Sequence, residues 1–214
     1  MDDVLGLYAG APRSVRAFLR GRVLLSDLES IERQVPETGT IVDLGCGHGL
    51  FANLMALRST RRDVTGIDLD PEKILVAGKT VGDRGNIDFI AGDFFTAEIP
   101  VCDVITIVDV LYLLERSEQI QILDECRRKL RSGGLLVWKA QERRPRWKFA
   151  FTWFQEMLTT SAGVTRGRHG RLSFLSREDA TDILQAAGFS VRIVEMRSYR
   201  PYSDILYLGV AAGS

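Results

Sequence analysis

The sequence predicts an α/β fold: a three-layer, doubly wound sheet of seven strands, mainly parallel, with an antiparallel last strand. Two observations predict it. Short apolar runs alternate with helical patterns from residue 40 to residue 188, which is typical of parallel strands joined by helices. The last two strand-like runs are separated by only a few residues around Arg200 and Pro201. That link is too short for a parallel crossover, so the final strand should run antiparallel to its neighbours.

Length and composition favour a single domain over residues 1–214. A chain of 214 residues with 45% hydrophobic residues suits one α/β domain with an insertion and a sizeable core. The longest apolar run, 101–114, is too short to span a membrane, and the acidic N-terminus does not resemble a signal peptide. The three cysteines are far apart and form no CxxC pair, which argues against a disulfide scaffold or zinc site. We therefore expect a cytoplasmic protein.

The first five strands and their helices follow from apolar runs and turn residues. Strands are predicted at 40–44, 63–68, 87–91, 102–108 and 135–139, and helices at 50–57, 71–79 and 117–130. Pro71 is a favourable first helical residue. Ser132-Gly133-Gly134 should end the last of these helices.

Three further segments complete the predicted fold. The N-terminal 36 residues form a helical cap, with a helical pattern over about 13–34, and residues 141–175 form a lid insertion between strands five and six. Ser176 to Asp179 has the form of a capping box and should open a helix closed by Gly188. The strands at 190–196 and 204–210 then end the sheet.

A glycine-rich turn is the strongest local signal for a ligand site. Residues 41–49 read IVDLGCGHG, so a buried strand runs into a turn with glycines at 45, 47 and 49. Such glycines let the backbone turn sharply and expose N–H groups at the start of the next helix. The dinucleotide fingerprint GxGxxG would need a glycine at position 50, where the chain has leucine. A nucleotide-binding oxidoreductase is therefore disfavoured.

With this turn and the strand ends that follow it, the sequence resembles the class I S-adenosylmethionine-dependent methyltransferases over nearly its whole length. The family's first motif, DxGxGxG, is matched from Asp43 to Gly49, and later motifs are matched by Gly66-Ile-Asp-Leu-Asp70, Gly92-Asp93-Phe94, Val108 to Tyr112, Leu130 to Gly134 and Ala187-Gly188-Phe189. The resemblance implies S-adenosylmethionine as the cofactor, S-adenosylhomocysteine as its product, and no metal. A relative that binds the cofactor without catalysis is a further alternative.

The resemblance also implies roles for the strand ends. Asp68 is expected to bind the ribose hydroxyls, Asp93 the adenine amino group, and the segment after Val108 the methionine part. The expected cofactor-binding residues are Asp43, Gly45, Cys46, Gly47, Gly49, Asp68, Leu69, Gly92, Asp93, Phe94, Val108 and Asp109.

The chemistry of the cofactor explains these residue types independently. Carboxylates can accept hydrogen bonds from its ammonium and ribose hydroxyls, and the carboxyl ends of parallel strands are where open α/β sheets bind ligands. Structural roles are alternatives at three positions: Asp43 could cap the turn, Asp93 could cap a helix, and Asp109 could be buried structure. Asp70, which precedes Pro71, is expected to cap a helix and not to bind.

Catalytic candidates are fewer, because methyl transfer mainly requires positioning and exclusion of water. A phenol or hydroxyl acceptor usually also needs a base. His169, in the insertion, is a candidate base, although a surface histidine is the simpler interpretation. Tyr8 and Tyr112 are candidates for contact with the methyl group or the acceptor. His48 is interpreted as a residue of the turn.

The insertion carries the information on the acceptor. Between residues 141 and 177 eight arginine and lysine residues face two glutamates, and five aromatic residues lie between 147 and 154. Either the aromatics pack a lid helix, or they line an apolar acceptor pocket while the cations meet an anionic group. We expect a small apolar or aromatic acceptor, such as a carrier-bound chain, a lipid or a natural-product intermediate. Contact with an acidic partner or membrane surface would also fit. A methyltransferase of RNA or protein, recruited through the insertion, is the alternative, although no nucleic-acid motif supports it.

Overall fold

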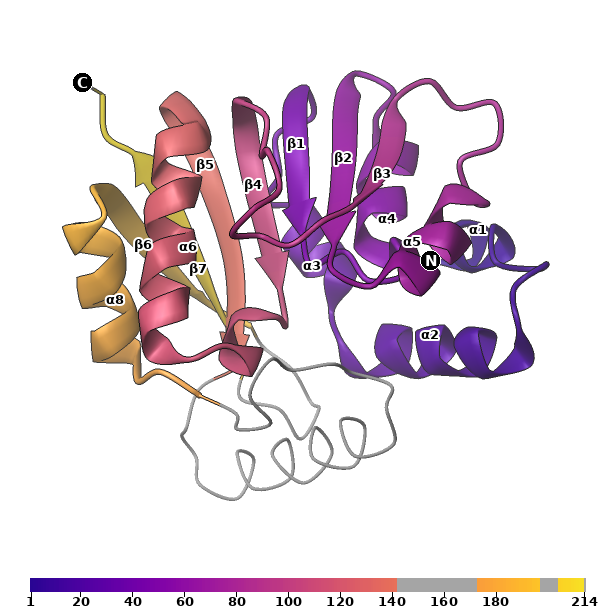
Figure 1. Ribbon diagram of the computed structural model, residues 1–214, viewed down its shortest axis with the longest axis horizontal. Coiled ribbons are helices and arrows are strands. Elements are labelled where there is room, and N and C mark those ends of the chain that lie inside the picture. Colours follow the sequence, from indigo (N-terminus) through magenta and orange to yellow (C-terminus); the bar gives the residue numbers. More distant parts are fainter. Residues whose placement is uncertain (142–172, 197–203, 214) are drawn as a thin grey trace. The chain divides into compact units, whose positions relative to one another are not determined.

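A computed structural model describes residues 1–141, 173–196 and 204–213 (Figure 1). It contains the predicted seven-stranded mixed sheet, with strand order β3-β2-β1-β4-β5-β7-β6. The chain divides into two compact units, Met1–Thr106 and Ile107–Ser214.

The first unit contains three parallel strands at the predicted positions. They are β1 (Gly39–Leu44), β2 (Arg62–Asp68) and β3 (Ile87–Ala91). In the register Asp43 is paired with Gly66 and Asp68 with Ala91. The carboxyl ends of β1 and β2 therefore lie next to each other, as the predicted cofactor site requires.

Helices α4 (Leu50–Arg58) and α5 (Pro71–Gly78) connect these strands. Pro71 is the first residue of α5, and the side chain of Asp70 accepts a hydrogen bond from the Glu72 N–H (3.0 Å). The predicted capping role of Asp70 is confirmed.

The N-terminal region contains three helices, and two of them lie where the sequence predicts one helical stretch over 13–34. They are α1 (Asp2–Gly6), α2 (Arg13–Leu25) and α3 (Leu28–Glu32). The chain breaks at Ser26, which is extended, because Asp27 caps α3 by accepting the Ser30 N–H. A buried pair between Arg62 Nη1 and Glu32 Oε1 (2.6 Å) joins this region to β2.

Strand β4 (Cys102–Val108) leads into the second unit, whose strands are β5 (Leu130–Gln141), β6 (Phe189–Glu195) and β7 (Asp204–Ala211). Strand β7 pairs antiparallel with both β5 and β6, which confirms the predicted direction of the last strand. A 3-10 turn η1 (Leu111–Leu113) and helices α6 (Arg116–Lys129) and α8 (Arg177–Ala186) complete this unit. Figure 1 shows α6 and α8 alongside β5 and β6.

Two helix ends test the predicted turn chemistry. At the start of α8, Ser176 Oγ accepts the Asp179 N–H (3.0 Å), so the predicted cap is confirmed. At the end of α6, however, the helix stops at Lys129 because Leu130 is already extended. Ser132 to Gly134 lies inside β5 instead of separating helix from strand. Gly133, with φ +74, bends the chain just before pairing with β7 begins at Leu135.

Within the described residues, no helix is long and apolar enough to cross a membrane. The three cysteines are free. Most of the insertion at 141–175, with its basic and aromatic residues, lies outside the described residues.

Candidate cofactor site

The glycine turn joins β1 to α4 in the first unit. Gly45, Gly47 and Gly49 all have positive φ angles, of 74°, 57° and 77°, a region that side chains with a Cβ rarely adopt. A Cβ on Gly49 would also lie 2.5 Å from Phe89 Cζ, whereas a Cβ on Gly47 would meet no atom within 4 Å. The turn is thus closely packed at Gly49 and open at Gly47, where a ligand can approach the backbone.

Asp43, just before this turn, is a buried carboxylate with incomplete hydrogen bonding. Its Oδ1 accepts a hydrogen bond from the Thr106 hydroxyl (2.6 Å), while Oδ2 is buried and has no hydrogen-bond partner among the described residues. Burial raises the pKa of Asp43 to about 7, and the nearby charge of Asp68 adds to the rise. The Thr106 hydrogen bond, the positive charge of Arg22 and a hydrogen bond from the Ala52 backbone N–H oppose it. A buried acceptor of this kind is costly unless a partner satisfies it.

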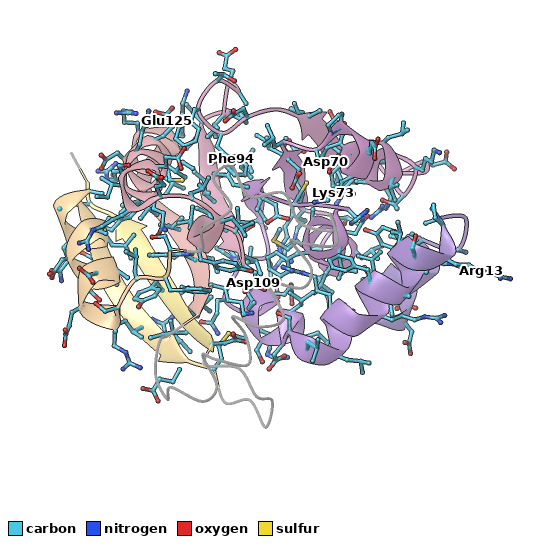
Figure 2. All side chains as sticks on the ribbon, turned by 60° about the horizontal axis from the view of Figure 1, so that its bottom comes forward. Arg13, Asp70, Lys73, Phe94, Asp109 and Glu125 are labelled. Carbon is cyan, nitrogen blue, oxygen red and sulfur yellow. The ribbon has the colours of Figure 1, made fainter. Side chains whose placement is uncertain are left out.

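Asp68, the last residue of β2, is held in place by two backbone groups. Its Oδ2 accepts the Gly47 N–H (2.8 Å) and its Oδ1 accepts the Asp70 N–H (2.9 Å). Each carboxylate oxygen keeps a lone pair for a further donor. The side chain is therefore preoriented beside the open part of the turn. Asp70 and Lys73, both labelled in Figure 2, pair with each other at the start of α5 (3.8 Å).

Gly92, Asp93 and Phe94 follow β3. Gly92 N–H donates to the Asp68 carbonyl (2.9 Å), which ties this segment to the end of β2. Asp93 Oδ1 accepts the Phe95 N–H (3.1 Å), so this carboxylate caps a local turn. The helix that it could have capped is not formed, because residues 94–96 form only a turn. The side chains of Asp93 and Phe94 are half-buried, and Leu69 is 49% exposed.

These residues fit S-adenosylmethionine. Asp43 presents an acceptor that lacks a donor, Asp68 is oriented with free lone pairs, and Gly47 leaves its side of the turn open. A cation with hydroxyl donors would satisfy both carboxylates.

Comparisons with known proteins agree. The profile of a family described as "Methyltransferase domain" matches residues 41–134, which contain the turn and the acidic strand ends. A ubiquinone biosynthesis O-methyltransferase from Nitrosomonas europaea is 26% identical over 174 residues, 79% of this chain and 71% of that protein. These matches support an S-adenosylmethionine-dependent methyltransferase. Its cofactor is S-adenosylmethionine.

Solved structures show the same fold. A methyltransferase from Aquifex aeolicus superposes with a TM-score of 0.66 and 19% identity, covering 89% of this chain and 93% of that one. A magnesium protoporphyrin IX methyltransferase from Synechocystis PCC 6803, solved with bound S-adenosylhomocysteine, gives a TM-score of 0.66 at 17% identity, covering 86% and 81%.

The three catalytic candidates of the methyltransferase lie in different surroundings. Tyr8 is buried, with its hydroxyl donating to the His48 carbonyl (2.7 Å) and accepting from Asn53. Tyr112, in η1, is buried and stacks on Phe174 (ring centroids 5.1 Å apart). His169 lies outside the described residues. A catalytic role for each stays a prediction, and the contacts of Tyr8 favour a positioning role.

In the second unit, Asp109 belongs to a charged cluster that the sequence did not predict. Asp109 follows β4 and is the one non-glycine residue of the described chain with a positive φ, 59°. Lys139, 3% exposed on β5, donates to Asp109 Oδ1 (2.7 Å) and Oδ2 (3.0 Å), and its Nζ lies 3.2 Å from Asp204 Oδ2. Figure 2 labels Asp109 in this cluster. The one feature of the sequence that could have indicated this cluster is Lys139, a lysine within the apolar run of β5.

Proposed function

We propose that this methyltransferase transfers the methyl group of S-adenosylmethionine to a small apolar or aromatic acceptor. The single observation that carries the cofactor site is the buried Asp43 carboxylate beside the open glycine turn, with one oxygen lacking a donor among the described residues. The name of the Nitrosomonas europaea relative supports a small acceptor that is methylated on oxygen. No feature of comparable strength in the described chain supports RNA or protein as the acceptor.

In this proposal each acidic strand end binds one part of the cofactor. Asp43 accepts from the ammonium, Asp68 accepts from the ribose hydroxyls, and Asp93 accepts from the adenine amino group. The remaining contacts are assigned to Gly45, Cys46, Gly47, Gly49, Leu69, Gly92, Phe94, Val108 and Asp109. Cys46 supplies its backbone, because burial, together with the charges of Asp43 and Asp68, raises the pKa of its thiol and keeps it un-ionised.

The chemistry requires little covalent work from the protein. When bound, S-adenosylmethionine would supply a methyl group on a positively charged sulfur. An acceptor in line with the methyl–sulfur bond takes the methyl group, and the sulfur leaves as the thioether of S-adenosylhomocysteine. The chain's own residues hold the reacting groups in line and exclude water. Tyr112 and His169 are the candidates for contact with the acceptor and for removal of a proton from a hydroxyl acceptor.

The basic aromatic stretch of the insertion supports an acceptor with an anionic part, such as a carrier-bound or lipid molecule, or contact with an acidic surface. Its cations are unsuited to the positive sulfur of the cofactor. Replacing Arg143, Arg144, Arg146 and Lys148 by serine should leave S-adenosylhomocysteine affinity within a few-fold. Binding to anionic vesicles, measured by sedimentation at low and high salt, should weaken. Unchanged vesicle binding would contradict an acidic contact through this stretch.

The cofactor assignment is tested by calorimetric titration with S-adenosylhomocysteine. Asp68→Ala should weaken binding at least tenfold, because hydrogen bonds to a charged group contribute about 1.5–3 kcal/mol each. Asp93→Ala should weaken it less, because one side-chain hydrogen bond is lost. Asp63→Ala, which removes an exposed acid from the same strand as Asp68, is the matched control and should have no effect. Unchanged affinity in Asp68→Ala would remove Asp68 from the site.

A further inference from the structure

A series of three buried or part-buried hydrogen bonds leads from Arg84 to the glycine turn of the first unit. Arg84 Nη2 donates to Asn53 Oδ1 (2.6 Å), Asn53 Nδ2 donates to the Tyr8 hydroxyl (3.0 Å), and that hydroxyl donates to the His48 carbonyl (2.7 Å). Asn53 is 0% exposed and Tyr8 is 1% exposed. The four residues come from the loop after α5, from α4, from the segment after α1 and from the turn itself.

Hydrogen bonding allows one direction along this chain. The His48 carbonyl can only accept and the Arg84 guanidinium can only donate, so both ends are defined. Tyr8 must therefore donate toward the turn and accept from Asn53. Burial raises the pKa of Tyr8 well above its ordinary value, so the hydroxyl keeps the proton that it donates.

Asn53 also holds a second carbonyl of the turn. Its Nδ2 lies 2.8 Å from the Gly49 carbonyl and 2.9 Å from the Thr80 hydroxyl. Because Arg84 occupies Oδ1, the amide nitrogen must face Tyr8, Gly49 and Thr80. The Gly49 carbonyl also accepts the Asn53 backbone N–H (2.9 Å) at the start of α4. Two successive carbonyls of the turn are thus held inside the protein, that of His48 by Tyr8 and that of Gly49 by the backbone and side chain of Asn53.

This arrangement bears on the cofactor because carbonyl direction determines the direction of neighbouring N–H groups. With the two carbonyls held inside, the peptide planes at the end of the turn cannot rotate without breaking a buried hydrogen bond. The peptide groups after His48 and Gly49 are therefore held directly next to the open position at Gly47. Preorganisation of a binding segment increases affinity, since less ordering occurs on binding.

We propose that Tyr8 is a positioning residue, which, with Asn53 and Arg84, holds the glycine turn in the conformation that binds the cofactor. The inference rests on the proposed function, because it assigns the turn to cofactor binding. It also makes the N-terminal segment part of the cofactor site through the turn, without direct contact. Figure 1 shows α1 near α4, as this connection requires.

Tyr8→Phe tests the proposal, since it removes the hydroxyl and keeps the ring. S-adenosylhomocysteine affinity, measured by calorimetry well below the melting temperature of every variant, should fall about five- to tenfold. Tyr207→Phe removes another buried tyrosine hydroxyl, in the second unit, and should leave the affinity unchanged. A lower melting temperature with unchanged affinity in Tyr8→Phe would show a structural role only and overturn the proposal.

Arg84→Met breaks the other end of this series of hydrogen bonds, at a residue that is less buried than Tyr8. This variant therefore tests the proposal even if Tyr8→Phe does not fold. It should also weaken S-adenosylhomocysteine binding, and Arg84→Lys should restore part of the loss. The double variant should lose less than the product of the two single losses, because both break one chain. Losses that multiply fully would contradict a connected chain. If the wild-type protein does not bind S-adenosylhomocysteine, the proposed function fails. If the wild type binds it and Tyr8→Phe and Arg84→Met bind it equally well, only this inference fails.

Discussion

A buried carboxylate lies at the end of β1 and another follows β4. These two carboxylates, Asp43 and Asp109, differ in the groups that balance their negative charge. Asp109, after β4, pairs through both oxygens with Lys139, and Asp204 lies on the same ammonium group. Asp43, near the end of β1, has a threonine hydroxyl on one oxygen and no hydrogen-bond partner in the described chain on the other. Both oxygens of Asp109 therefore have a hydrogen-bond donor within the protein, whereas only one oxygen of Asp43 has a donor among the described residues.

The difference supports the proposed contact of Asp43 with the ammonium, because one of its oxygens lacks a hydrogen-bond donor among the described residues. Leaving a buried carboxylate without a paired cation raises its pKa and costs stability, and the pKa of Asp43 is raised to about 7. In the proposed function, the ammonium group of the cofactor adds a hydrogen-bond donor and a positive charge to that of Arg22, which already opposes the rise in the Asp43 pKa. The Asp109 cluster instead uses its ion pair to hold a residue in a left-handed conformation, which is strained for most side chains.

The largest effect is expected at the cluster of Lys139, Asp109 and Asp204. Lys139→Met leaves Asp109 and Asp204 without their cation, and breaking a buried pair in this way costs about 3–5 kcal/mol. The free energy of unfolding, from urea titration, should fall by that amount. Lys129→Met, which removes a lysine paired at the surface of α6, should cost less than about 1 kcal/mol. Equal losses in the two variants would show that the cluster has no special role in stability.

Replacing Asp43 should change the free energy of unfolding in the opposite direction. Asp43→Asn removes the buried charge, keeps an acceptor for Thr106, and should stabilise the cofactor-free protein by about 2–4 kcal/mol at pH 8. The sign follows from the raised pKa. The folded state holds the Asp43 proton more tightly than the unfolded state, so ionisation costs stability as the pH rises from about 4 to 7. The gain should therefore vanish below about pH 4, where both states bind the proton. Urea titrations at pH 4 and pH 8 measure it, and a destabilised Asp43→Asn at pH 8 would contradict this account.

The same variant should also bind the cofactor less well. The neutral amide of Asp43→Asn lacks the negative charge that the ammonium requires, so S-adenosylhomocysteine affinity at pH 8 should fall at least tenfold. Higher stability with weaker binding is the expected pattern for a residue kept for function. Calorimetry gives the affinity, and Asp63→Asn is a matched control with an exposed acid on β2. An affinity equal to that of the wild type would place the ammonium elsewhere.

Local chemistry allowed much of this to be predicted from sequence. The glycine turn, the acidic residue at the end of β2, the Asp70 cap and the antiparallel last strand each depend on neighbouring residues or on the length of one connection. The Lys139 cluster and the hydrogen bonds of Tyr8 depend on register and on contacts between distant segments. The interruption between α2 and α3 at Ser26 was not predicted, because a helical pattern continues on both sides of this residue.

The central claim is that Asp43 takes up a charge partner when the cofactor binds. Its most direct test is the number of protons released on S-adenosylhomocysteine binding, from calorimetry in buffers of different ionisation enthalpy. With a pKa of about 7 in the free protein, Asp43 is mostly protonated at pH 6 and ionised at pH 8. Pairing with the ammonium favours the ionised form, so about one proton should be released at pH 6 and almost none at pH 8, with affinity rising between them. Asp43→Asn should abolish the release at pH 6. No proton release at pH 6 in the wild type, or the same release in Asp43→Asn, would contradict the account.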